Sequence, residues 1–227
     1  MKTFNQYRYL TLTTFFVCVL GTMIYAQASR ASFEVAGGPG FSFLPGSTSP
    51  PDKIGFQIGL FSSIRINNLF SIHTGISFDR KGSKYSSVRL HDFQNAENDL
   101  LDLNYDYFSI PLVLRITFHK PFKFYINSGL YGALLHSSML ISNGLYEGYI
   151  CHNNTPFAPA FDYGLVNGLG VLIPLHKQVE LTAELRNNRG LSDVRGDPDY
   201  FLHEDTPVRT NLTTLMLGVS FRLDSRK

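Results

Sequence analysis

One segment constrains the fold of this chain more than any other: residues 102–135, DLNYDYFSIPLVLRITFHKPFKFYINSGLYGALL. In its first half the even positions from Phe108 to Phe118 are all apolar, whereas the odd positions include Tyr107, Arg115 and Thr117. The second half alternates in the same way after a turn at 119–121. Strands of soluble sheets usually have roughly 5–6 residues. Segments this long, apolar on one side and polar on the other, predict strands that cross a membrane around a polar interior.

The same alternation recurs along the chain. Six further strands are predicted at 33–43, 54–66, 69–80, 158–173, 178–191 and 210–223. Short links are expected at 67–68, 119–121 and 174–177, and long links at 44–53, 81–103, 136–157 and 192–209. An even number of strands with links of alternating length is typical of bacterial outer-membrane barrels, and closure removes exposed sheet edges. We therefore predict an all-β fold, an eight-stranded antiparallel up-and-down transmembrane β-barrel with short periplasmic turns and long extracellular loops.

The N-terminus has the features of an export signal. Lys2 and Arg8 precede an apolar run at 10–24, which ends at the small-residue sequence 26–28, Ala-Gln-Ala. This order predicts a secretory signal peptide over residues 1–28 and a barrel domain over residues 29–227. A transmembrane anchor is disfavoured because the run is short, is broken by threonines and lacks a charged stop. Cys18 lies inside the run without small residues before it, which argues against lipid attachment there.

Composition excludes several classes of protein. Mean hydropathy is −0.03, and no other long apolar run occurs, which excludes a helical membrane protein. The formal charge of +2 falls to about zero once Lys2 and Arg8 are removed, so nucleic acid is not expected as a partner. Cys151 is the one cysteine after residue 28, so no intramolecular disulfide is expected.

The predicted inward face carries charges of both signs. Its polar members are Glu34, Gln57, Arg65, His73, Asp79, Arg115, Lys123, Tyr125, Asn127, Glu180, Glu184, Arg186 and Arg222. The interior of an eight-stranded barrel is just wide enough for side chains to fill it. We therefore expect a lumen plugged by paired charges, with inward glycines leaving room for long side chains, and no open pore.

Five pieces of sequence, in this order, resemble the PorT-like outer-membrane β-barrel family of the Bacteroidetes type. They are IGFQIGLFSSIRINNLFSIHTGISFDRKG at 54–82, YDYFSIPLVLRI at 105–116, INSGLYGALL at 126–135, FDYGLVNGLGV at 161–171 and LMLGVSFRL at 215–223. The tyrosine-rich approach to an Ile-Pro-Leu core, followed by a Gly-aromatic-Gly strand, is the most specific part. The resemblance implies an eight-stranded outer-membrane barrel. One family namesake takes part in type IX protein secretion, and the family has no catalytic motif.

Some small outer-membrane barrels modify lipids with a Ser, a His and an acid. Here Ser71, His73 and Ser77 share one face of a predicted strand, with Asp79 and Glu180 as possible acids. Ser71 and His73 lie near the periplasmic start of that strand, away from the rim where lipopolysaccharide chemistry is expected. A histidine hydrogen-bonded inside a polar lumen is the favoured interpretation, and no catalytic residue is predicted.

No metal or cofactor site is predicted either. His136, His152 and His203 lie in or beside long links without the paired spacing of metal ligands. The last long link is acidic, with Asp193, Asp197, Asp199, Glu204 and Asp205, but the spacing does not fit an EF-hand loop. Cys151 is expected to be an unpaired thiol without an inferred role.

The sequence thus predicts a non-enzymatic, monomeric protein of the bacterial cell outer membrane that acts in envelope structure, protein secretion or loop-mediated binding. Its expected partners are outer-membrane lipid and envelope or secretion proteins that contact the links 81–103 and 136–157. One alternative is a lipid-modifying enzyme with its site at the rim. A second is a soluble lipocalin-like carrier, which would be apolar inside and polar outside.

Overall fold

The computed structural model describes residues 31–44, 53–86, 100–118, 123–144, 148–153, 155–156, 158–194 and 207–223; the predicted signal peptide lies outside these ranges. The strands are β1 (Ala31–Phe43), β2 (Lys53–Arg65), β3 (Phe70–Ser86), β4 (Leu100–Phe118), β5 (Phe124–Gly144), β6 (Gly148–Asn153), β7 (Phe161–Pro174), β8 (Val179–Gly190) and β9 (Asn211–Arg222). Within the described residues, no helix is both long and apolar enough to cross a membrane.

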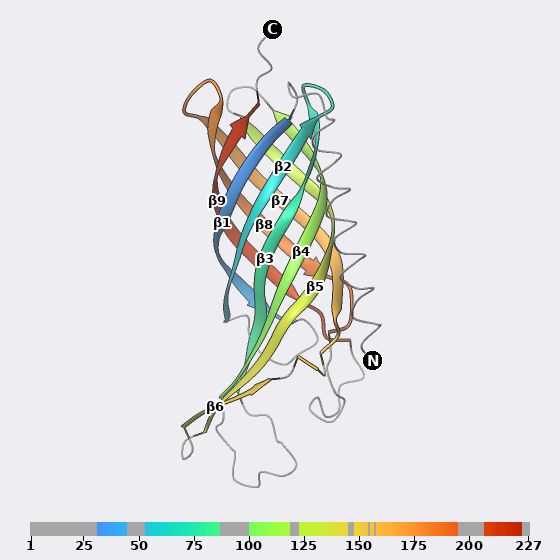
Figure 1. Cartoon of the computed structure of the whole chain (residues 1–227), viewed down its shortest axis with the longest axis vertical. Coiled ribbons are helices and arrows are strands. Elements are labelled where there is room, and N and C mark those ends of the chain that lie inside the picture. The colour runs from blue at the N-terminus through green and yellow to red at the C-terminus, as the bar shows by residue number, and fades with distance from the viewer. Residues whose placement is uncertain are drawn as a thin grey trace, which may run out of the picture.

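Eight of these strands close into an antiparallel barrel (Figure 1). Each strand pairs with its neighbour in the order β4-β3-β2-β1-β9-β8-β7-β5, and β5 returns to pair with β4. Val35 lies opposite Val219 where the first and last strands meet, and Leu112 lies opposite Leu130 in the β4–β5 pair. The predicted eight-stranded barrel is confirmed, and β6 is an additional strand that pairs only with β5.

The two faces of the barrel wall differ in polarity as the alternation predicts. Leu112 and Leu217 on the outer face are each 62% exposed, whereas His73 and Tyr125 on the inner face have no exposed surface. An apolar exterior around a polar interior suits a barrel surrounded by lipid. The lipocalin-like alternative is therefore wrong, because it requires the opposite polarity.

Aromatic side chains gather on the outer face near both ends of the barrel. Toward the long links, the rings of Phe56 and Phe78 are 5.9 Å apart and those of Phe78 and Phe108 are 5.5 Å apart. Near the short turns, the rings of Phe118 and Phe124 stack at 4.7 Å. Two such levels correspond to the aromatic girdles that mark the membrane interfaces of outer-membrane barrels.

The short turns are tight, as predicted. The side-chain oxygen of Asn67 accepts hydrogen bonds from the backbone N–H groups of Leu69 and Phe70, each at 2.8 Å, which fixes the turn between β2 and β3. Between β7 and β8 the N–H of Leu175 donates to the carbonyl oxygen of Val179 at 3.0 Å. The predicted turn at 119–121 lies outside the described residues.

Parts of two predicted long links are strand instead. β3 continues to Ser86 and β4 begins at Leu100, so both ends of the link predicted at 81–103 extend the β3–β4 pair. β5 continues to Gly144 and β6 pairs back onto it within the link predicted at 136–157. Figure 1 shows β3, β4 and β5 running on past the other strands toward β6. These parts lack a continuous apolar lipid-facing side, so the pattern that identifies the barrel strands fades there.

A β-bulge marks where β5 leaves the barrel. Tyr107 pairs with Leu135, but the preceding Asp106 pairs with Ser137, so His136 is an extra residue on β5. Beyond the bulge the alternation is reversed: Ser138 is buried and Met139 is 45% exposed. A single inserted residue thus shifts the faces of the outer half of β5.

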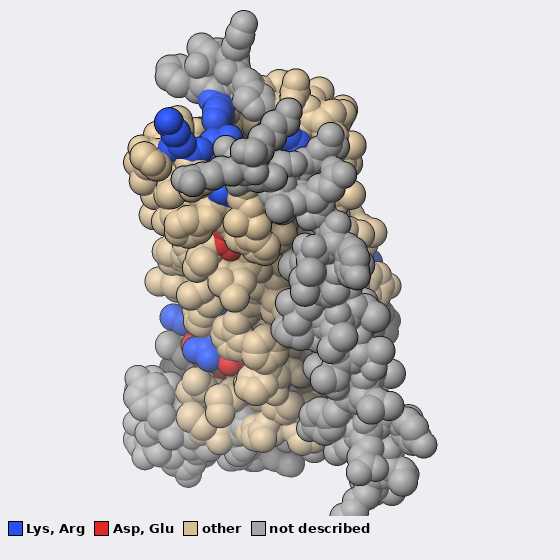
Figure 2. All heavy atoms as spheres, turned by 45° about the horizontal axis from the view of Figure 1, so that its top comes forward, with Lys and Arg blue, Asp and Glu red and all other residues tan. Residues whose placement is uncertain are grey.

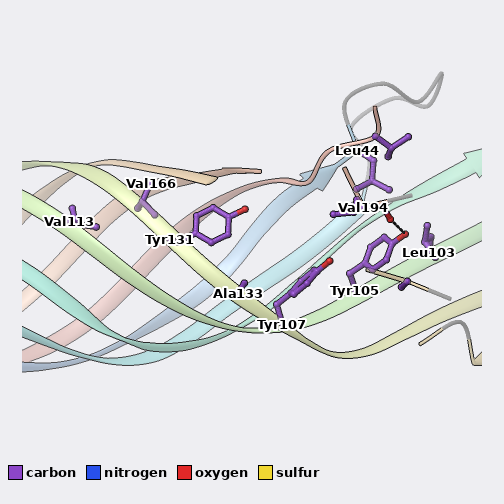
Figure 3. Packing of buried hydrophobic residues seen from close by; sticks show 11 residues of the cluster. Leu44, Leu103, Tyr105, Tyr107, Val113, Tyr131, Ala133, Val166 and Val194 are labelled. Carbon is purple, nitrogen blue, oxygen red and sulfur yellow. Dashed lines mark hydrogen bonds between the residues drawn. The ribbon is translucent and has the colours of Figure 1, made fainter. Parts of the chain in front are cut away.

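The long-link end of the lumen is closed by an apolar and aromatic cluster. Its buried members are Leu44, Leu103, Tyr105, Tyr107, Val113, Tyr131, Ala133, Ala158, Val166, Val194 and Val208 (Figure 3). Val194 and Val208, from the two described ends of the link predicted at 192–209, are joined by a backbone hydrogen bond of 2.8 Å. The hydroxyl of Tyr105 donates to the carbonyl oxygen of Val194 at 3.2 Å. The two described ends of this link are therefore part of a plug.

Candidate functional site

Five buried polar side chains cross the lumen nearer the short turns: Glu34, Arg115, Asn127, Glu184 and Arg186, here called the short-turn cluster. Arg186 donates to both carboxylate oxygens of Glu184, with Nε–Oε1 at 2.7 Å and Nη2–Oε2 at 3.1 Å. Arg115 Nε donates to the side-chain oxygen of Asn127 at 3.0 Å, and Arg115 Nη1 lies 3.5 Å from Glu34 Oε2. The paired charges that the sequence predicts are thus found across four strands.

Aromatic and hydroxyl groups complete this cluster. Tyr125 donates through its hydroxyl to Glu184 at 2.9 Å, and the guanidinium of Arg115 lies 4.0 Å from the Tyr125 ring centroid. Thr182 donates to Glu34 at 2.8 Å. Buried charges are tolerated when both partners and their remaining hydrogen-bonding groups are satisfied. The cluster therefore fills the lumen with a connected network.

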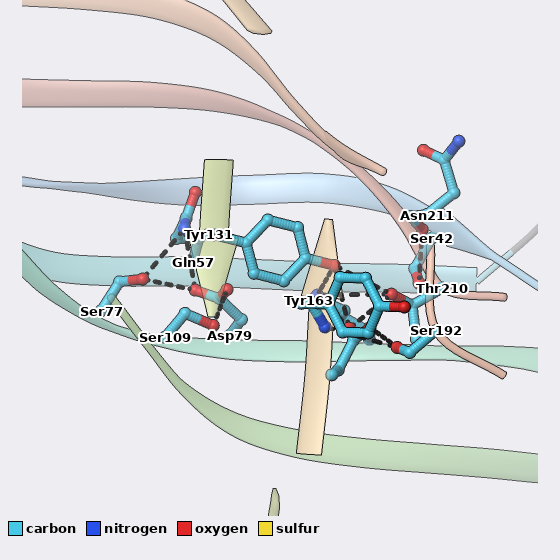
Figure 4. A network of polar contacts seen from close by, with 12 residues as sticks. Ser42, Gln57, Ser77, Asp79, Ser109, Tyr131, Tyr163, Ser192, Thr210 and Asn211 are labelled. Atoms are coloured by element: carbon cyan, nitrogen blue, oxygen red, sulfur yellow. Dashed lines mark hydrogen bonds and ion pairs between the residues drawn. The ribbon is translucent and has the colours of Figure 1, made fainter. Parts of the chain in front are cut away.

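A second network lies nearer the long links and centres on Asp162. Figure 4 shows its members Tyr131, Ser192 and Thr210. Lys81 Nζ is 3.1 Å from Asp162 Oδ2, and neither side chain has exposed surface. Tyr131 and Thr210 donate to the same carboxylate oxygen at 2.9 and 2.8 Å, and Ser192 donates to the other. These five residues, here called the Asp162 cluster, come from β3, β5, β7 and the segments flanking the last link.

Asp79 organises a smaller group on the wall beside the Asp162 cluster (Figure 4). Its carboxylate accepts hydrogen bonds from Gln57 at 2.8 Å, Ser77 at 2.8 Å and Ser109 at 2.6 Å. The group is fully buried, so its donors serve to hold the carboxylate in place. We interpret this arrangement as structural, because its serine hydroxyls are buried and donate to the carboxylate with no histidine among the described members.

The candidate catalytic residues do not come together. His73 Nδ1 lies 2.8 Å from the hydroxyl of Ser63, and the His73 ring stacks on Phe61 at 5.2 Å. Ser77 is bound to Asp79, and Glu180 lies at the short-turn rim with Lys123 and Arg222. A Ser–His–acid site needs all three groups within hydrogen-bond reach of one another. The described residues thus place His73 in the hydrogen-bonded lumen position that the sequence favours.

The other candidates occupy separate positions. His136 is the bulge residue, with its ring 5.4 Å from Phe108. Asp193 accepts a hydrogen bond from the backbone N–H of Val208 at 3.1 Å. Cys151 is exposed on β6 as a free thiol. The side chain of His152 and residues His203, Asp197, Asp199, Glu204 and Asp205 lie outside the described parts. Among the side chains that are described, no group of three or more His, Cys, Asp or Glu is placed to hold a metal ion.

Sequence reasoning missed two inward lysines. The alternation places Lys81 in the link 81–103 and Lys53 in the link 44–53, yet both side chains are buried in the barrel. Lys53 pairs with Asp102 and also donates to the carbonyl oxygen of Leu103 at 3.0 Å. The inward orientation of Lys81 could have been predicted from its position, because it continues the odd-numbered inward series of β3 two residues after Asp79.

A pocket opens at the opposite, short-turn end of the lumen. It has a volume of about 270 Å³, and its lining includes Arg65, Arg115, Lys123, Lys177, Arg222 and a single carboxylate, Glu180. Figure 2, in which this end comes forward, shows Lys and Arg gathered on the rim. Lys123 Nζ and Arg222 Nη2 share Glu180 Oε1 at 2.9 and 2.8 Å. The mouth of the lumen is thus predominantly basic.

Solved structures of similar architecture include small outer-membrane and surface proteins. Neisserial surface protein A is 15% identical, with 86% of this chain and 99% of that chain covered at a TM-score of 0.47. A major outer membrane protein of Thermus thermophilus is 15% identical, with 85% and 98% covered at 0.48. Ail, the attachment invasion locus protein of Yersinia pestis, is 13% identical, with 86% and 99% covered at 0.42.

Comparison with curated proteins gives no significant sequence match. The sequence profile of one family, described as outer membrane protein beta-barrel domain, matches residues 25–196. The match spans most of the barrel and agrees with its apolar exterior, polar interior and aromatic girdles. The chain therefore belongs to the outer membrane protein beta-barrel domain family and is a protein of the bacterial outer membrane.

Proposed function

We propose that this protein is a non-enzymatic outer-membrane scaffold that binds an envelope or extracellular protein through the extension formed by β3, β4, β5 and β6. The observation that carries the proposal is the extra pairing of β6 with β5 beyond the barrel, from Met139–Asn153 to Gly144–Gly148. A barrel needs no such strand to close. In a protein whose lumen is filled by the two clusters, the extension is the part best placed to meet a partner.

The packed lumen supports a role other than conduction. The short-turn cluster and the Asp162 cluster cross the interior with buried, paired charges, and the apolar plug closes the long-link end. We expect purified protein in a planar bilayer to give no steady current. A stable open conductance would contradict a plugged scaffold.

The binding role is tested by shortening the extension. Met139 and Asn153 are paired, so residues 140–152 are replaced by an Asn-Gly turn that closes the hairpin at that pair. A photo-crosslinking residue at Ser137, below the excised part, and one at the lipid-facing Leu217 provide the readout in cells. We expect a discrete protein adduct at position 137 of the full-length chain, its loss after the excision, and none at position 217. Equal adducts before and after excision would contradict binding through the extension.

The PorT-like resemblance suggests protein secretion as the process that the scaffold serves. A deletion strain compared with its complemented parent would lose secreted proteins from the medium if this holds, and an unchanged set of secreted proteins would favour a role in envelope structure. We also propose that the protein acts as a monomer, because the closed ladder leaves the barrel itself without a free edge.

A further inference from the structure

We infer that the pocket at the short-turn end of the barrel is a binding site for a phosphate-bearing ligand on the periplasmic side. This site lies at the end opposite the extension and is independent of the scaffold function proposed above. Five cationic side chains line the pocket with one carboxylate, and both termini of the described barrel reach the same rim. In outer-membrane barrels the short turns face the periplasm.

Charge balance is the first argument. Arg115 is compensated inside the lumen by Glu34 and Glu184, at 3.5 and 3.6 Å. The remaining four cations of the pocket, Arg65, Lys123, Lys177 and Arg222, face Glu180 alone. Within the described residues, neither Arg65 nor Lys177 has an ion-pair partner. The pocket therefore carries an excess of positive charge, which an anion would neutralise.

Unused hydrogen-bond donors provide the second argument. Arg115 is 95% buried by side-chain area, lines the floor of the pocket, and its Nη2 donates no hydrogen bond among the described residues. Arg222 Nε is likewise buried without a hydrogen-bond acceptor in the described part of the chain. Buried polar groups in native proteins are normally hydrogen-bonded. Two guanidinium donors without acceptors at one pocket indicate that an acceptor-rich ligand completes the site.

The chemistry of the donors favours phosphate. Guanidinium groups present pairs of N–H donors that match the oxygens of phosphate or carboxylate. A phosphate monoester carries a charge of about −1.5 to −2 near neutral pH, so it compensates more of the excess than a carboxylate does. The polar rim also includes the exposed Asn67 and Asn68 of the β2–β3 turn, whose side-chain amides are further donors. A soluble phosphate ester and the phosphodiester headgroup of a phospholipid in the periplasmic leaflet share these acceptor oxygens, although the diester carries less charge.

The test is a calorimetric titration of the protein with inorganic phosphate at low ionic strength. The protein is the full-length mature chain in uncharged maltoside micelles. The Arg65→Gln/Lys177→Gln variant removes two cations that support no described ion pair, and we expect phosphate affinity to fall by roughly tenfold or more. Lys84→Gln at the opposite end, where Lys84 is exposed, is a single-charge control and should leave affinity within about twofold.

The Glu180→Gln variant tests whether phosphate affinity rises when a competing negative charge is removed. Glu180 competes with the ligand for Lys123 and Arg222, so removing its charge should tighten phosphate binding, by roughly threefold or more. Absence of phosphate binding to the wild-type protein up to millimolar concentration would overturn the inference. So would binding that Arg65→Gln/Lys177→Gln leaves unchanged, or weaker binding in a Glu180→Gln variant that retains the heat-dependent gel shift of a folded barrel.

A second arm identifies the source of the phosphate. Short-chain phosphatidylglycerol, added as a monomer below its micelle-forming concentration, is titrated against the same variants. Tighter binding of this lipid than of inorganic phosphate, lost in Arg65→Gln/Lys177→Gln, would assign the site to a lipid headgroup. Tighter binding of inorganic phosphate would assign it to a soluble ester. Failure of both ligands would again overturn the inference.

Discussion

Lys81 and Asp162, 81 residues apart in the chain, form a fully buried ion pair of 3.1 Å between Nζ and Oδ2 near the long-link end of the lumen. Tyr131 and Thr210 donate to the same carboxylate oxygen. The pair links β3 to β7 across the interior, because these strands are not neighbours in the barrel wall. It therefore ties opposite parts of the wall together.

Replacing Asp162 with Asn should destabilise the barrel strongly. The substitution keeps the shape of the side chain but leaves the Lys81 ammonium buried without its counter-charge, which costs about 3–5 kcal/mol in comparable pairs. Urea titration of the protein in detergent micelles, followed by the heat-dependent shift in electrophoretic mobility, measures the loss. Lys81→Met combined with Asp162→Asn should recover part of it, with a coupling of about 0.5–3 kcal/mol.

The exposed Lys84 serves as the control for this experiment. Lys84→Met should change the free energy of unfolding by no more than about 0.5 kcal/mol. Equal losses for Asp162→Asn and Lys84→Met would mean that the buried pair contributes nothing specific to stability.

The barrel strands could be predicted because lipid and lumen impose opposite polarities on alternate residues. Phe108, Leu112 and Leu114 face outward and Arg115 faces inward, as the sequence indicates. The short turn at Asn67 was also predictable, since asparagine stabilises tight turns through its own side chain.

The remaining features depend on interactions that one sequence does not display. His136 is inserted as a bulge only because Asp106 and Tyr107 of β4 pair on either side of it. Glu34 lies 81 residues from Arg115, and Asp162 lies 81 residues from Lys81. The inward orientation of Arg115 was therefore predictable from the sequence, but these pairings were not. The basic pocket is lined by side chains from distant parts of the chain. That Arg115 and Arg222 each have an N–H group without a hydrogen-bond acceptor can be recognised only from their neighbours in the structure.

Arginine substitutions on β4 should distinguish the two faces of the wall. Leu114 is 44% exposed on the outer surface, so Leu114→Arg places a charge in lipid and should cost roughly 2–4 kcal/mol near the bilayer midplane. Ile116→Arg should impair insertion for the same reason. Thr117 lines the basic pocket, so Thr117→Arg should be milder. Folding yield into phospholipid vesicles measures all three, and equal damage at 114 and 117 would contradict the assignment of faces.

Gly170 provides the space that Tyr125 occupies. A Cβ atom at position 170 would lie 2.3 Å from Cζ of the Tyr125 ring, and the ring is fixed by Glu184 and by the guanidinium of Arg115. Gly170→Ala should therefore destabilise the barrel by about 1–3 kcal/mol through overpacking.

The control is a double-mutant cycle with Tyr125→Leu, which shortens the side chain that Gly170 accommodates. If the steric explanation holds, Gly170→Ala should cost much less in the Tyr125→Leu background, as measured by the same urea titration. An unchanged cost in that background would point to the backbone of β7 instead of the Tyr125 contact.

Deleting His136 should convert the bulge into a regular ladder and leave the facing of the outer half of β5 unchanged. Without His136, Leu135 opposite Tyr107 is followed directly by Ser137 opposite Asp106, so Ser138 keeps its inward position opposite the buried Tyr105. In a Cys151→Ser background, Ser138→Cys should be protected from a membrane-impermeant maleimide and Met139→Cys should react, since Ser138 is 0% and Met139 45% exposed. With His136 deleted the two reactivities should stay as they are. An exchange of the two reactivities would show that the outer half of β5 slides by one residue to keep a bulge, and would contradict a register fixed by the pairing of Asp106 with Ser137.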